Sequence, residues 1–126
     1  MEENTLKVQQ MEALEELHNY LIKLVPAVEA IIIELRGEKR SDTDELFNAI
    51  INGINWSIEV LNRTMDIVNE NDEVIEKENI NDTIKKFSFA IREHNELDIA
   101  DILEKNILPF LVTVKSRVSV ITNRTS

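Results

Sequence analysis

Hydrophobic side chains in the first third of the chain recur with the spacing of a helix. From position 14 they are separated alternately by three and four residues, through three heptads. This repeat keeps side chains on one face of an α-helix. The pattern ends just before Gly37, which can adopt the left-handed conformation that closes a helix, so it predicts a first helix over about residues 5–36. The residues of this seam are Leu14, Leu17, Leu21, Leu24, Val28, Ile31 and Leu35.

A second amphipathic segment follows a short polar turn. Ser41, Asp42 or Thr43 is placed to cap its start, and hydrophobic residues recur in two adjacent rows over about residues 43–70. The two rows together form an apolar arc of roughly 200°, much wider than the single buried stripe of an ordinary surface helix. We therefore expect this helix to contact more than one neighbour, or a second subunit. The first row is Phe47, Ile51, Ile54, Ile58, Leu61, Met65 and Val68.

An acidic, Asn-rich stretch separates the second helix from the third. Residues 69–79 have little periodicity and predict a connection, with Val74 and Ile75 packed against the rest of the protein. Hydrophobic positions at helical spacing then predict a third helix over about residues 79–94. Asn95 is suited to close this helix at its C-terminus.

A fourth helix is predicted over about residues 98–122. Its last part, 111–122, is rich in β-branched residues and would suit a strand, but one strand without a partner in the chain is an improbable element. The chain contains only two Gly and two Pro. Four amphipathic helices with short connections predict an all-α fold, an antiparallel up-down-up-down four-helix bundle, in a single domain spanning 1–126.

Each of the two prolines falls inside a predicted helix. A proline removes one backbone hydrogen bond, so Pro26 and Pro109 predict kinks in the first and fourth helices. The two positions lie at nearly the same height of the predicted bundle. The kinks either improve packing or open a groove between these two helices.

Charge and composition exclude several classes of function. Lys and Arg number 14 against 24 Asp and Glu, for a net charge of −10, which repels nucleic acid and anionic membranes. The chain has no Cys, so disulfides and thiol catalysis are excluded. We expect no signal peptide and no membrane span, and hence a cytoplasmic protein.

No established catalytic pattern is present. Two glycines cannot build a phosphate-binding loop, so we expect no cofactor. A di-iron site in a bundle needs Glu-x-x-His from two helices. Glu15 and His18 have this spacing, but Ile91 stands three positions before His94, so the second motif is missing.

Acidic residues on the first and fourth helices offer an alternative, enzymatic function. Carboxylates on neighbouring helical turns can hold Mg²⁺ together with substrate phosphates. ELDIADIL at 96–103 resembles the acidic helix of the all-α nucleoside triphosphate pyrophosphohydrolases, and EALEE at 12–16 could be its partner helix. In that family the two helices are close in sequence, whereas here about 80 residues separate them. The metal ligands of this alternative are Glu12, Glu15, Glu16, Asp98, Asp101 and Glu104.

Other residues indicate binding to a protein. The second helix carries a polar stripe composed mostly of Asn, including Asn52, and amides are cheaper to desolvate than carboxylates. Trp56 borders this stripe, and tryptophan is enriched among binding hot spots. A solvated helix face explains the same stripe. Phe89, Leu108 and Val112 fall outside the apolar seams of their helices, so we expect all five residues to contact a partner or a second copy in a homodimer.

Two segments carry a family resemblance. ADILEKNILPFL at 100–111 and INGINWSIEVLNRTMDIV at 51–68 resemble small uncharacterised helical proteins of low-GC Gram-positive bacteria, and more loosely the flagellin export chaperones. The resemblance implies a bundle acting as a chaperone or adaptor in motility or secretion. The leading hypothesis is therefore a non-enzymatic protein that binds another protein.

Overall fold

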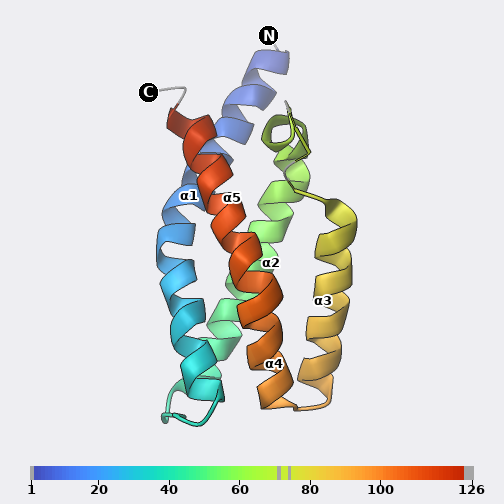
Figure 1. Cartoon of the computed structure of the whole chain (residues 1–126). Coiled ribbons are helices and arrows are strands. Elements are labelled where there is room, and N and C mark those ends of the chain that lie inside the picture. The colour runs from blue at the N-terminus through green and yellow to red at the C-terminus, as the bar shows by residue number, and fades with distance from the viewer. Residues whose placement is uncertain (1, 71, 74, 124–126) are drawn as a thin grey trace.

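The structure, a computed structural model, describes residues 2–70, 72–73 and 75–123. It confirms the predicted all-α fold of four antiparallel helices, and the described residues contain no strand (Figure 1). None of the described helices combines the length and apolar character needed to cross a membrane. The first three helices are α1 (Glu2–Leu35), α2 (Thr43–Val68) and α3 (Lys77–Arg92). The fourth is continuous and consists of α4 (Glu96–Ile102), the π-helical turn η1 (Leu103–Ile107) and α5 (Leu108–Asn123).

The core lies where α1 packs along both α2 and the fourth helix (Figure 1). The predicted seam of α1 is buried along its whole length. This seam meets the apolar faces of α2 and α5 on either side. The β-branched residues 111–122 form part of helix α5, as expected. Fully buried members of this core include Leu14, Leu17, Leu21, Leu61, Leu111 and Val114.

The turn between α1 and α2 is closed by a buried polar contact. Gly37 has a φ of +137°, which confirms its role at the end of the first helix. Asp42 occupies the cap position of α2 but makes no side-chain capping bond. Instead the Thr43 hydroxyl accepts a 2.8 Å hydrogen bond from the backbone N–H of Arg40 and donates a 2.7 Å bond to the Glu34 carboxylate.

Asn95 serves both helices at the turn between α3 and α4. Its backbone N–H donates a 3.2 Å hydrogen bond to the carbonyl of Ala90 and so helps to close α3, as predicted. Its side-chain oxygen accepts a 3.2 Å bond from the backbone N–H of Asp98 and caps the start of α4. His94 takes the left-handed conformation that ends α3, with a φ of +55°. In the preceding connection Ile75 is buried as predicted, whereas Val74 lies outside the described residues.

The prolines do not open a groove between the first and fourth helices. Pro26 lies inside α1, and Pro109 stands in the first turn of α5, directly after η1. Both are exposed, and α1 packs against α4, η1 and α5. The π-helical turn at 103–107 adds one residue to a turn of the helix and ends two positions before Pro109. Proline has no N–H and cannot donate a backbone hydrogen bond within the helix.

Helix α2 buries small and polar residues against the bundle, among them Gly53, Ser57 and Thr64. The hydroxyls of Ser57 and Thr64 are buried and donate to the backbone carbonyls of Gly53 and Val60, each at 2.8 Å. At Gly53 the ring of Tyr20 crosses so close that an added Cβ would collide with the Tyr20 hydroxyl and lie 2.9 Å from its Cζ atom. The glycine is therefore needed for the approach of this ring.

We predict that Gly53→Ala destabilises the protein, although alanine favours a helix. The added methyl group displaces Tyr20, and overpacking of this kind outweighs the gain of about 1 kcal/mol in helix propensity. The free energy of unfolding should fall by about 1–2 kcal/mol in urea denaturation followed by circular dichroism. In a Tyr20→Ala background the same substitution should be stabilising; a loss of equal size there would show that Tyr20 is not the cause.

Candidate functional site

A hollow lies between α2 and α3, backed by the fourth helix. No Cα atom in the described part of α2 comes within 8 Å of one in α3, a wider spacing than helices in direct contact have. The resulting cavity has a volume of about 490 Å³, within the range of ligand-binding pockets. We call it the α2–α3 groove. Its apolar lining comprises Ile54, Ile58, Ile75, Ile80, Ile84, Ile107, Pro109 and Phe110.

Helix α3 is tied to the bundle at both ends of the groove. At one end the rings of Phe47 and Phe87 meet edge to face, with centroids 6.3 Å apart. At the other, the Asn69 side chain binds the backbone of Ile75 twice, accepting from its N–H at 3.0 Å and donating to its carbonyl at 2.9 Å. These two attachments hold α3 across the opening.

The groove has a buried floor and a half-exposed apolar wall. Ile54 and Ile107 are only 1% exposed and belong to the core. Ile58, Ile84 and Phe110 pack on that core but remain partly exposed. Polar and charged residues from α3 and its N-terminal cap, from η1 and from α5 complete the lining, namely Glu76, Asn79, Asp82, Thr83, Lys86, Lys105, Asn106 and Thr113.

Two of the predicted partner-binding residues meet at a second, shallower hollow. Asn52 and Trp56 line it together with Tyr20 and Gly53. The Tyr20 and Trp56 rings pack edge to face, with centroids 5.3 Å apart. Trp56 is half-buried, while Asn52 is exposed.

The other three predicted partner-binding residues are not brought together with these. Phe89 is 59% exposed on α3 and Val112 is 46% exposed on α5. Leu108 is half-buried. None of the three lines either hollow.

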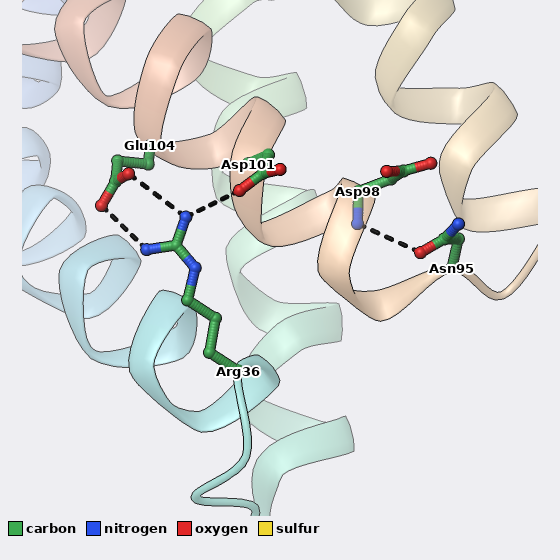
Figure 2. Close-up of polar contacts among 5 residues, drawn as sticks. All are labelled: Arg36, Asn95, Asp98, Asp101 and Glu104. Carbon is green, nitrogen blue, oxygen red and sulfur yellow. Dashed lines mark hydrogen bonds and ion pairs between the residues drawn. The ribbon is translucent and has the colours of Figure 1, made fainter.

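Two acidic residues of the fourth helix bind an arginine (Figure 2). Arg36, at the end of α1, donates hydrogen bonds of 2.9 and 3.2 Å to the Glu104 carboxylate and of 2.8 Å to Asp101. The bonds from Arg36 hold the pKa of Glu104 below its ordinary value, and those from Glu104 and Asp101 raise the pKa of Arg36. Asp98 lies on the neighbouring turn, with its carboxylate away from Arg36.

The structure does not gather the six proposed metal ligands into one cluster. The three acids of α1 are exposed, and the nearest, Glu16, precedes Arg36 by 20 residues, about 30 Å along the helix axis. In the part of the chain that is described, no three His, Cys, Asp or Glu side chains are arranged to hold a metal ion. The convergence required by the pyrophosphohydrolase hypothesis is therefore not observed.

The hydrophobic pattern of the sequence did not predict the groove, although the wide apolar arc of the second helix indicated an additional contact surface. The wide apolar arc of α2 leaves one flank half-covered, because α1 buries the other flank and α3 stays at a distance. Ile58 belongs to this flank. The contributions of Ile84 and Phe110 had no separate signal, because each belongs to the apolar seam of its own helix.

One protein family matches the chain, over residues 12–117, and its description is "Domain of unknown function (DUF8042)". The match includes every residue that lines the α2–α3 groove. No curated protein and no solved structure matches the chain. The comparisons thus support a helical domain and assign it no activity.

We predict that the contribution of Arg36 to stability depends on pH. Because Arg36 lowers the pKa of Glu104 below its ordinary value of 4.5, the stabilisation is present above about pH 4.5 and is lost as the pH falls through the lowered pKa. Arg36→Met should therefore reduce the free energy of unfolding more at pH 7 than at pH 2.5, as measured in urea. Arg63→Met is the control, because Arg63 forms no ion pair among the described residues. Equal pH dependence in both variants would contradict this role of Arg36.

Proposed function

We propose that this chain, which belongs to the family described as a domain of unknown function (DUF8042), binds a helical segment of a partner protein in the α2–α3 groove. The half-buried apolar wall of Ile58, Ile84 and Phe110 carries the proposal. These side chains keep part of their surface in water. A bound helix would cover that surface, and burial of apolar surface favours binding by roughly 25 cal/mol per Å².

The shape of the groove suits a helix. Amphipathic helices dock into apolar grooves through side chains that recur every three or four residues. From Asn79 to Lys86, α3 lines the groove over two helical turns, or about 10 Å. This length accommodates two or three successive apolar side chains from one face of a bound helix.

A chaperone or adaptor role follows from binding of this kind. The resemblance of residues 51–68 and 100–111 to flagellin export chaperones supports a role in motility or secretion, carried out in the cytosol. Such a role needs reversible binding to a segment of another protein. A groove that is open and only partly apolar is suited to reversible binding, because part of the ligand remains in water.

The proposal is tested with helical peptides selected by phage display on the purified protein. We expect Phe110→Ala to weaken the affinity of a selected peptide at least tenfold in fluorescence anisotropy, because truncating a central aromatic contact typically removes more than 1 kcal/mol of binding energy. Circular dichroism would check that the variant folds. Ile84→Ala provides a second groove variant, on a different helix.

Val112→Ala is the matched control, since Val112 lies on the same helix as Phe110 but outside the groove. We expect it to change the affinity less than twofold. Loss of binding with Val112→Ala and not with Phe110→Ala would assign partner binding to the other face of α5 and contradict the proposal. A stable dimer in light scattering, broken by Phe110→Ala, would assign the groove to self-association instead.

A further inference from the structure

Two lysines from different elements line the same groove. Lys86 comes from α3 and Lys105 from η1. Both are exposed. Within the residues that the structure describes, neither forms an ion pair, whereas Arg36 and Lys39 do. The groove of a strongly acidic chain therefore contains two cations that are not neutralised by direct contact.

The surroundings of Lys105 explain why it is unpaired. On a helix, the residue four positions earlier is the usual partner of a lysine. For Lys105 this residue is Asp101, whose carboxylate is bound at 2.8 Å by Arg36. The adjacent Glu104 is bound by the same guanidinium. Arg36 thus occupies the two nearest acids and leaves Lys105 available to a ligand.

The two acids of the groove, Asp82 and Glu76, lie on α3 and immediately before it, respectively. Asp82 stands one turn before Lys86, but the two groups are not within ion-pair distance. Glu76 precedes α3 and lies ten residues before Lys86, about 15 Å away along the helix axis, and its carboxylate accepts a 2.7 Å hydrogen bond from Asn79. Neither acid of the groove lies within ion-pair distance of Lys86 or Lys105, so both ammonium groups remain available to a carboxylate of the ligand.

We infer that the helix recognised by the groove carries carboxylates at the edge of its apolar face, placed to pair with Lys86 and Lys105. This inference rests on the proposed function and specifies its ligand. The apolar face contacts Ile58, Ile84 and Phe110, and the acidic edge selects among helices of similar hydrophobicity. Complementary charge of this kind acts mainly on specificity.

The net charge of the chain limits the rest of the ligand. A charge of −10 repels a partner that is acidic overall, whereas an ion pair within the groove acts below the screening distance of about 8 Å. The recognised helix therefore combines carboxylates beside its apolar face with a neutral or basic outer face.

The test compares two versions of one selected peptide, with Glu or with isosteric Gln at the edge of its apolar face. We expect the protein to bind the Glu peptide about 3- to 10-fold more tightly at low salt, because two partly exposed ion pairs contribute modestly. The preference should shrink to less than twofold in the Lys86→Gln/Lys105→Gln double variant. It should also decline as the salt concentration rises.

The control is the double variant Lys23→Gln/Lys85→Gln, which changes the net charge equally at two positions outside the groove. It should retain the preference for the Glu peptide. Binding that depends on Phe110 but shows no preference for Glu, or prefers Gln, would overturn the inference and leave the proposed function standing. The absence of any peptide that binds through Phe110 would instead overturn the proposed function.

Discussion

Helix α1 buries its leucine seam between α2 and the fourth helix, and this packing decides how much apolar surface the other helices have left to cover. Leu17 and Leu21 are inaccessible to solvent, as are Leu111 and Val114 of α5. Because interiors are packed closely, α2 and α5 are held firmly against α1. Helix α3 packs on the fourth helix, but no Cα atom of its described residues comes within 8 Å of a Cα atom of α2. The exposed flank of α2 and the α2–α3 groove are consequences of this uneven packing.

Helix α3 is attached to α2 by polar contacts near its first residue and by an aromatic pair near its last turn. The Asn69 side chain hydrogen-bonds both the backbone N–H and the carbonyl of Ile75, just before α3 begins. The Phe47–Phe87 pair joins α2 to α3 at the opposite end of the groove. Between them α3 fully buries few side chains, mainly Ile80 and Phe87. A helix held in this way preserves an open apolar surface beside a well-packed core, which is the condition for binding another helix without unfolding the bundle.

Arg36 connects the fold with the electrostatics of the groove. It joins the end of α1 to the fourth helix through Asp101 and Glu104, so acids that resemble metal ligands in the sequence serve as ion-pair partners. The same contact leaves Lys105 without its usual helical partner. One side chain thereby binds two acids of the fourth helix and leaves Lys105 unpaired in a chain whose overall charge is strongly negative.

The sequence by itself determined the helices and the antiparallel order in which they follow one another. Helical periodicity depends on residues three or four positions apart, so the seam of α1, the end at Gly37 and the helical character of residues 111–122 could all be predicted. Boundaries next to turns depend on more than this spacing: Asn95 helps to close α3 through its backbone N–H and caps α4 through its side chain, and the second contact depends on the path of the chain.

Only the tertiary structure decided which faces remain uncovered and which charges meet. Phe110 and Ile84 belong to the seams of their own helices, yet they line the groove because of the position of α3 relative to α2. Arg36 reaches Glu104 across 68 positions of the sequence. Contacts over such separations depend on the relative placement of whole helices, which the local spacing of hydrophobic residues does not specify.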